Sequence, residues 1–281
     1  MSEAKIKNLV DVIVDSYKKH DAIIKIEGRD QINKDVIIEI IEDLRKLIFA
    51  GFFGVKRLRA GGFEYYVGEL LEQIDFNLGK QIQRAFRAKG ESEEVIAAKS
   101  ERILYDFLKS IPDVRAMLAL DVEATFDGDP AASDTEEVIM SYPGLYAIMV
   151  YRLAHVLFKA GVPVIPRMMT EHAHSLTGID IHPGATIGRY FFIDHGTGIV
   201  IGETCVIGEH VKIYQGVTLG ALSTKGGQQL RGKRRHPTIE DNVIIYSGAS
   251  VFGGDTVIEE GVVIGSNAFI TSSVRNNKRL D

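Results

Sequence analysis

The second half of the chain places aliphatic residues at intervals of six, and this period is its most informative pattern. The series is Ile181, Ile187, Ile193, Ile201, Ile207, Ile213, Leu219, Ile239, Ile245, Val251, Ile258, Ile264 and Ile270. A small or branched residue follows most of these four positions later, as at Ala185, Thr197 and Cys205. One hexad forms a short strand and a tight turn, and it cannot bury its apolar face alone. Stacked hexads, about three to a coil, bury that face along the axis of a triangular prism, so the period predicts a parallel β-helix.

Three interruptions of this period predict loops. The steps are eight residues after Ile193, seven after Val251 and twenty after Leu219, where three hexads would span eighteen. The first insertion holds Asp194-His195-Gly196-Thr197-Gly198, and the longest is the glycine-rich, basic segment 224–236. Solenoids accept insertions at their corners, and corner loops are where they bind ligands.

Residues 1–178 show a helical period instead. Ser133-Asp134-Thr135-Glu136 fits a capping box, Pro166 suits the first turn of a last short helix, and residues 145–157 predict a helix that leads to the repeats. We therefore expect an α+β chain with a helical domain over 1–178, a β-helix over 179–275 and a short polar tail over 276–281. Apolar stripes mark three further helices and indicate core or subunit interface rather than ligand grooves: Ile6, Leu9, Val10, Ile13, Val14 and Tyr17; Val36, Ile37, Ile40, Ile41, Leu44, Leu47 and Ile48; Phe63, Tyr66, Val67, Leu70, Leu71 and Ile74.

Composition indicates a cytoplasmic protein. The 281 residues carry a formal charge of −5, which gives no electrostatic reason to expect nucleic acid or an anionic membrane as a partner. The first residues lack the apolar run of a signal peptide, and no segment is long enough to cross a membrane. The single cysteine, Cys205, occupies an inward position of the repeat, where we expect a small buried hydrophobe.

Several motifs together resemble the serine O-acetyltransferase family. They are Asp180-Ile181-His182-Pro183-Gly184-Ala185, Ile193-Asp194-His195-Gly196-Thr197-Gly198, Ile201-Gly202-Glu203-Thr204, Gln215-Gly216-Val217-Thr218-Leu219-Gly220 and Arg235-His236-Pro237. The resemblance covers about residues 125–275. It implies a left-handed β-helix and the transfer of acetyl from acetyl-coenzyme A to the hydroxyl of L-serine, for cysteine biosynthesis.

Acetyl transfer to a hydroxyl requires a base for the hydroxyl proton. Histidine is the usual base near neutral pH, and a carboxylate on its second nitrogen fixes the tautomer. His195 lies at an interruption of the repeat, between an aspartate and Gly-Thr-Gly. The resemblance makes His195 the general base and Asp180 the carboxylate that orients it.

The resemblance also assigns residues that bind the amino acid. Arg235 and His236 belong to the active site at the substrate end, since a forked guanidinium suits a carboxylate, and His236 counts among the catalytic residues. Asp194 and Asp129 face the ammonium group of serine.

The acyl donor implied is acetyl-coenzyme A, with no metal. Its pantetheine arm is expected along the edge formed by Gly220-Ala221, Ser247-Gly248 and Ser266. The basic residues of the long loop are Arg231, Lys233 and Arg234. They either bind phosphate groups or are exposed to solvent, and the sequence favours neither of these two roles.

Other interpretations fit these residues less well. Glu171-His172-Ala173-His174 looks like a metal pair, but helical positions two apart point to different faces. A zinc hydratase would need ligands from His195, His210 and His236, whose surroundings match transferase motifs instead. Transfer to a sugar hydroxyl is the alternative that keeps the fold and the base. A non-catalytic scaffold is disfavoured because the catalytic residues stand in their expected places.

The resemblance extends to assembly. It implies a homotrimer with the acyl site between subunits, and a dimer of trimers through the N-terminal helices. Relatives carry a tail that ends in isoleucine and binds a sulfhydrylase. This chain ends Asn276-Asn277-Lys278-Arg279-Leu280-Asp281, and burying a second carboxylate in place of a hydrocarbon is unfavourable. We therefore expect weak or no sulfhydrylase binding through this tail.

Overall fold

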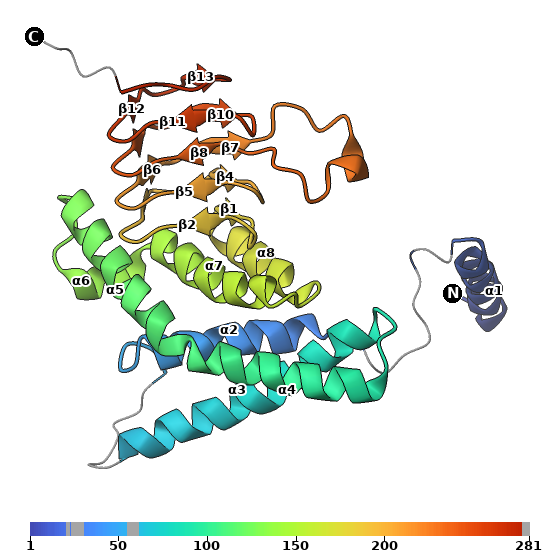
Figure 1. Cartoon of the computed structure of the whole chain (residues 1–281). Helices are drawn as coiled ribbons and strands as arrows, with labels where there is room; N and C mark the ends of the chain where they lie inside the picture. Colours follow the sequence, from blue (N-terminus) through green and yellow to red (C-terminus); the bar gives the residue numbers. More distant parts are fainter. Residues whose placement is uncertain (21–22, 24–30, 55–61, 277–281) are drawn as a thin grey trace, which may run out of the picture. The chain divides into compact units, whose positions relative to one another are not determined.

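The computed structural model describes residues 1–20, 23, 31–54 and 62–276 (Figure 1). The chain divides into two compact units, Met1–Ile32 and Asn33–Asp281. The first contains the amphipathic helix α1 (Glu3–Lys19), in which no side chain is buried. Its apolar stripe therefore forms no core within this unit, and its role as a core or a subunit interface stays a prediction. Most of the expected tail, residues 277–281, lies outside the described residues.

The second unit begins with helices and ends with strands. The last helix ends at Thr177 and the first strand begins at Asp180, close to the predicted boundary. The helices are α2 (Lys34–Ile48), α3 (Gly62–Arg87), α4 (Glu93–Lys109), α5 (Ile111–Gly128), α6 (Thr135–Ser141), α7 (Pro143–Lys159) and α8 (Ile165–Thr177).

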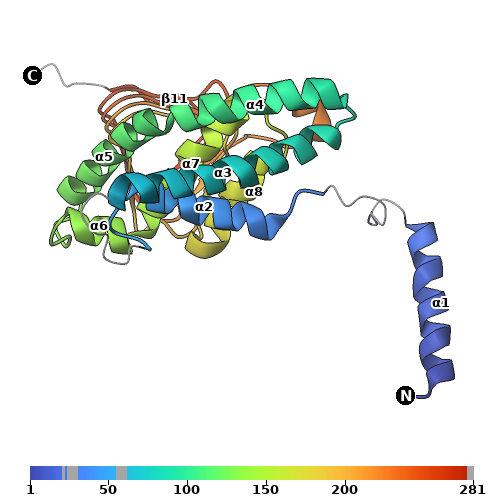
Figure 2. The same ribbon diagram turned by 90° about the horizontal axis from the view of Figure 1, so that it is seen from below.

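The predicted stripes are buried to different extents. The stripe of α2 is confirmed, with five of its aliphatic side chains in the core. The α3 stripe is buried only from Leu70 onward, and Phe63 is 49% exposed. Helix α7 is buried on most faces, because it packs between other helices and the first coil of strands (Figures 1 and 2). Pro166 stands in the first turn of α8, as predicted.

The capping box predicted at Ser133-Asp134-Thr135-Glu136 lies one residue later. Asp134 is the N-cap of α6, and its side chain accepts a 2.7 Å hydrogen bond from the Glu137 N–H. The Glu137 carboxylate accepts in turn from the Ser133 N–H at 2.8 Å. Aspartate and serine are both good caps, so the sequence pattern alone did not fix which one begins the helix.

The strands confirm the predicted parallel β-helix architecture. They form sheet A (β1-β4-β7-β10-β13), sheet B (β2-β5-β8-β11) and sheet C (β3-β6-β9-β12), with parallel pairing throughout. Each strand pairs with the strand three places later, so three strands make one coil. The strands are β1 (Asp180–Ile181), β2 (Thr186–Ile187), β3 (Phe192–Asp194), β4 (Val200–Ile201), β5 (Val206–Ile207), β6 (Lys212–Tyr214), β7 (Thr218–Gly220), β8 (Thr238–Ile239), β9 (Ile244–Ile245), β10 (Ser250–Phe252), β11 (Val257–Ile258), β12 (Val263–Ile264) and β13 (Phe269–Ile270).

The repeat's aliphatic residues from Ile181 to Ile264 are buried along the prism, with one correction among the small residues. Thr197 is exposed, and Ile199 is buried in its place, since the insertion after Ile193 shifts the inward position by two residues. Cys205 is buried as expected, and burial raises the pKa of its thiol to about 12.

All three interruptions fall at corners. The insertion after Ile193 lies at the corner between sheets C and A, and the other two lie between sheets A and B. The longest leaves the prism between β7 and β8 and contains a 3₁₀ turn at Gly227–Leu230 (Figure 1). This loop connects two consecutive strands directly, so the twenty residues between Leu219 and Ile239 contain no further hexads of the prism.

Side chains of α7 cap the first coil. Alternate residues of this coil bond to the second coil, as where the Asp180 N–H donates to the Ile199 carbonyl at 2.9 Å, and the carbonyls that point the other way have no partner strand. The Tyr151 hydroxyl donates to the Ala185 carbonyl at 2.7 Å, and Arg152 donates to the Gly188 carbonyl at 2.9 Å. Buried carbonyls need such partners, so α7 fixes the helices on the prism.

No helix among the described residues combines the length and the apolar content that crossing a membrane requires.

Candidate active site

His195 lies at the corner between β3 and β4. Its backbone φ is 59°, in the left-handed region, and its side chain is 70% exposed. Gly196 is required behind it, because a Cβ there would lie 2.5 Å from the Ile179 side chain. The strained corner therefore presents the imidazole to solvent, with Nε2 3.7 Å from Oδ1 of Asp194.

A pocket of about 340 Å³ brings three predicted residues together. Asp129, Asp194 and His195 all line it. Its other walls come from the end of α6, the start of α7 and β3: Ser141, Tyr142, Pro143, Gly144 and Ile193. Helix α7 approaches closely here, since a Cβ on Gly144 would lie 2.6 Å from the Ile193 carbonyl oxygen.

Asp129 is held in its ionised form at the end of α5. The Tyr142 hydroxyl donates to Oδ2 at 2.6 Å, and the Ala131 N–H donates to Oδ1 at 2.9 Å. These bonds, with the nearby charges of Lys212 and His195, lower the pKa of Asp129. The same contact raises the pKa of Tyr142 to about 12. Tyr142 was not predicted, because its partner lies in another helix and no spacing rule links the two.

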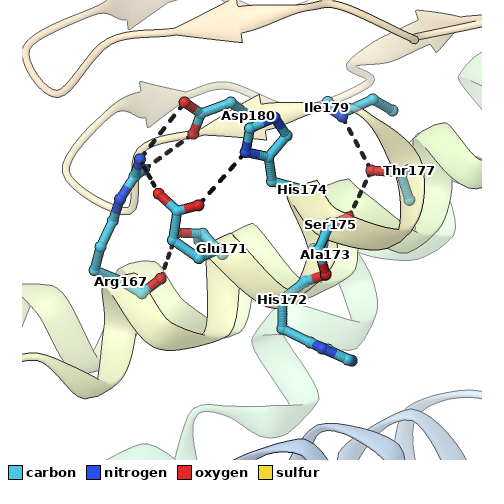
Figure 3. A network of polar contacts seen from close by, with 10 residues as sticks. Arg167, Glu171, His172, Ala173, His174, Ser175, Thr177, Ile179 and Asp180 are labelled. Atoms are coloured by element: carbon cyan, nitrogen blue, oxygen red, sulfur yellow. Dashed lines mark hydrogen bonds and ion pairs between the residues drawn. The ribbon is translucent and has the colours of Figure 1, made fainter.

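Asp180 makes a different contact from the one expected. Its carboxylate accepts from Arg167 of α8 at 3.0 Å, and the Arg167 guanidinium also contacts Glu171 (Figure 3). Both Asp180 and His195 are described, and no hydrogen bond joins them. The orienting role of Asp180 therefore stays a prediction.

Figure 3 also shows the segment Glu171-His172-Ala173-His174, whose two histidines were predicted to point to different faces of the helix. Glu171 and His174 share one face of α8, with His174 Nδ1 3.5 Å from Glu171, while His172 points elsewhere. Among the described residues, atoms of Glu171, His174 and Asp180 lie within 4.8 Å of one another. Arg167 contacts both carboxylates and supplies the positive charge there.

Arg235 and His236 lie at the corner between sheets A and B. Arg235 forms an ion pair with Glu203, and the Thr204 N–H donates to His236 Nδ1 at 3.0 Å. Burial, then the nearby Arg235 charge, lowers the pKa of His236 to about 4. The imidazole is therefore neutral near pH 7, and because Nδ1 accepts, its proton is on Nε2. The glycine at 202 makes room, since a Cβ there would lie 2.1 Å from the His236 ring.

The predicted site residues thus divide between two corners of one prism. Ser247, Gly248 and Ser266 lie at the corner of His195, on later coils, and a 3.4 Å hydrogen bond joins the two serine hydroxyls. Gly220 and Ala221 lie at the other corner, with Arg235 and His236. One face of the prism, formed by sheet A, separates the two corners. One chain therefore does not bring the two groups together.

The histidines of the zinc interpretation are also separated. His210 lies at the third corner, between β5 and β6, where its ring centroid is 4.5 Å from that of Tyr190 and the two rings are tilted by 38°. His195, His210 and His236 therefore do not converge within this chain.

Comparison with known proteins identifies the family. No family model matches the chain. The plasmid serine acetyltransferase of Synechococcus elongatus is 43% identical over 245 residues, which cover 84% of this chain and 76% of the relative. Serine acetyltransferase 1 of Entamoeba histolytica, solved with L-cysteine, superimposes with a TM-score of 0.75 at 36% identity, over 88% of this chain and 86% of that one. A serine acetyltransferase solved with CoA superimposes with a TM-score of 0.55 at 26% sequence identity. The match covers 86% of this chain and 94% of that one.

The identity to the Synechococcus protein extends over most of both sequences, and the fold agrees along the helices and the prism alike. On these grounds the chain belongs to the serine acetyltransferase family.

Proposed function

We propose that this chain transfers the acetyl group of acetyl-coenzyme A to the hydroxyl of L-serine. The observation that carries the proposal is the pocket in which Asp129, Asp194 and His195 meet. Two carboxylates can bind the ammonium group of an amino acid, and the exposed imidazole can accept the proton of its hydroxyl group. The relatives named above are serine acetyltransferases, and one was solved with CoA, which supports acetyl-coenzyme A as the donor. A sugar acceptor is not favoured by these relatives.

In the proposed reaction His195 takes the proton of the serine hydroxyl as its oxygen attacks the thioester carbonyl. The tetrahedral intermediate then collapses, the carbon–sulfur bond breaks, and the imidazolium returns the proton to the leaving thiolate. The exposure of His195 permits this, because the ring can reach a bound acceptor without moving the backbone. Asp180 would have to exchange part of its contact with Arg167 for His195 in order to orient that ring.

We propose that the complete site forms between two copies of the chain. His195, Asp129 and Asp194 would come from one copy, and Arg235 and His236 from the next. Arg235 would then exchange its ion pair with Glu203 for the carboxylate of serine. A closed ring of three such contacts gives a trimer, and each of its three interfaces would hold one site. The left-handed coil, the dimer of trimers and a cytoplasmic location belong to the same proposal.

The pantetheine arm would lie in the same interface. Ser247, Gly248 and Ser266 would line it from one copy, and Gly220 and Ala221 from the next. A glycine column supports this path, since Gly198, Gly216 and Gly248 follow one another along the corner of His195 and carry no side chains that would block it.

Release of free thiol from acetyl-coenzyme A tests the proposed function. The purified protein is supplied with L-serine, with a sugar acceptor, or with no acceptor. Serine-dependent release, with O-acetylserine identified by mass spectrometry, is the expected result. Release that depends on the sugar alone, or no release with any acceptor, would overturn the proposal.

A further inference from the structure

Lys212 contacts the Asp194 carboxylate and the backbone beside Asp129, although no sequence motif marks it. It is the first residue of β6, and its side chain is only 19% exposed. Its ammonium donates a 2.6 Å hydrogen bond to the carbonyl oxygen of Gly128, the residue before Asp129. The same ammonium lies 3.6 Å from Oδ2 of Asp194. One lysine therefore contacts the α5 terminus that carries Asp129 and the strand that carries Asp194.

Aromatic rings flank this lysine. The centroids of the Phe192 and Tyr214 rings each lie 4.7 Å from the ammonium nitrogen. The Gly128 backbone is pressed against Phe192, since a Cβ there would lie 2.5 Å from that ring. The rings shield the ammonium from water, and its contacts with oxygen are stronger there than at an open surface.

The formal charges around the pocket favour an acceptor with one positive charge. Asp129 and Asp194 contribute two negative charges, and Lys212 contributes one positive charge. One negative charge is left, which the single ammonium group of an amino acid balances. Without Lys212 both carboxylates would line the same pocket without this compensating charge, and their repulsion would favour protonation of one.

We propose that Lys212 is a positioning residue for the amino-acid acceptor. It fixes the Asp129 turn to the prism and leaves the pocket with the one negative charge that the acceptor's ammonium neutralises. The inference rests on the proposed function and adds a residue to the acceptor side of the same site. It predicts that Lys212 governs the binding of serine and not that of acetyl-coenzyme A.

Steady-state kinetics of K212M, K212Q and K212R in the assembled protein test this. For K212M we expect KM for serine to rise about tenfold or more, since a hydrogen bond to a charged group contributes about 1.5–3 kcal/mol. KM for acetyl-coenzyme A should stay within about twofold, and kcat should fall less than KM rises. K212R keeps the charge and should recover most of the serine affinity. K212Q replaces K212M if the latter has a lowered melting temperature.

The matched control is K109M, at an exposed lysine of α4 far along the chain from the pocket. It should leave both KM values unchanged. Unchanged KM for serine in K212M and K212Q would overturn the role of Lys212 while leaving the function intact. An equal rise in both KM values, or K212R as impaired as K212M, would overturn it as well. Wild-type protein that acetylates no serine would overturn the function itself.

Discussion

The left-handed backbone of His195 complicates the obvious test of its role. Alanine is strained at a φ of 59°, whereas asparagine tolerates this region. We therefore predict that H195N keeps the corner intact and lowers kcat by about 10²- to 10⁴-fold, the usual contribution of a positioned base. Thiol release measures the rate, and circular dichroism checks the fold.

His210 offers a matched control for this substitution. It is also exposed and has a φ of 56°, but it lies at the corner between sheets B and C. H210N should therefore retain wild-type turnover. If H195N were as active as H210N, His195 would not be the base.

The neutral His236 predicts that stability falls in mild acid. Its pKa is about 4 in the folded chain and about 6.5 when unfolded, so the unfolded chain binds more protons between these values. The contribution of this group is fully present above pH 6.5 and is lost as the pH falls towards 4. Between pH 7 and pH 5 the free energy of unfolding should drop by about 2 kcal/mol per chain from this residue.

Urea unfolding of wild type and H236Q at these two pH values, at equal chain concentration, measures the effect. The decrease should be smaller in H236Q by about that amount. Burial also lowers the pKa of His155 and His182, so part of the acid sensitivity will remain in H236Q. An identical decrease in both proteins would show that His236 is not buried in neutral form.

The candidate site residues that stand in local motifs could be predicted from the sequence, whereas those that make contacts across the fold could not. Asp129, Asp194 and His195 were predicted and share one pocket. Tyr142 and Lys212 contact the same carboxylates but come from a helix start and a strand whose local sequence resembles its neighbours. Tyr142 lies 13 residues from Asp129, and Lys212 lies 84 residues from Gly128, whose carbonyl it also contacts, so only the folded chain reveals these partners.

At the scale of elements, the buried pair of Arg152 and Asp121 is the main polar link among α7, α5 and the first coil. Arg152 donates to both Asp121 oxygens at 2.6 and 2.7 Å, and Asp121 also accepts from the Phe191 N–H. Removing one member of a buried pair leaves an uncompensated charge. We predict that R152M lowers the free energy of unfolding by about 3–5 kcal/mol.

Asparagine in place of Asp121 removes that charge and still accepts from Phe191. The double variant R152M/D121N should therefore be more stable than R152M alone, as measured by urea unfolding. If the double variant were the less stable of the two, the loss in R152M would come from packing or from the unsatisfied carbonyls of the first coil.

The strands could be predicted more closely than the helices. A six-residue period names each inward position directly, and it failed where the two-residue insertion put Ile199 in place of Thr197 and at the last strand, where Ile270 is only half-buried. A helical stripe shows which face is apolar but not what covers it. The stripe of α2 is core, whereas that of α1 is exposed. The sequence also gave no reason to expect the first coil to need caps from α7.

At the scale of the whole molecule, the division of the site between two corners predicts complementation between inactive chains. H195N and R235A should each be inactive alone. In mixed trimers, some interfaces would pair the intact His195 of an R235A chain with the intact Arg235 of an H195N chain. Random assembly at equal amounts gives one such interface in about four.

Co-expression with two affinity tags, followed by the thiol assay, measures this. Activity should reach about one quarter of the wild-type value. Mixing without subunit exchange is the control and should give none. A stable monomer by light scattering, or no activity in verified mixed trimers, would contradict a site shared between chains.

The coverage of the two ends of the prism has a consequence for solubility. A parallel coil is a template on which another chain's strand can polymerise, and exposed strand edges are a common route to fibres. Here α7 occupies one end, and the chain's own residues cover part of the other. Val274 bridges to Ile258, and the Asn276 side chain donates to the Glu260 carbonyl at 2.6 Å. This short segment after the last coil therefore acts as protection against end-to-end growth, and its integrity bears on whether the protein remains dispersed at high concentration.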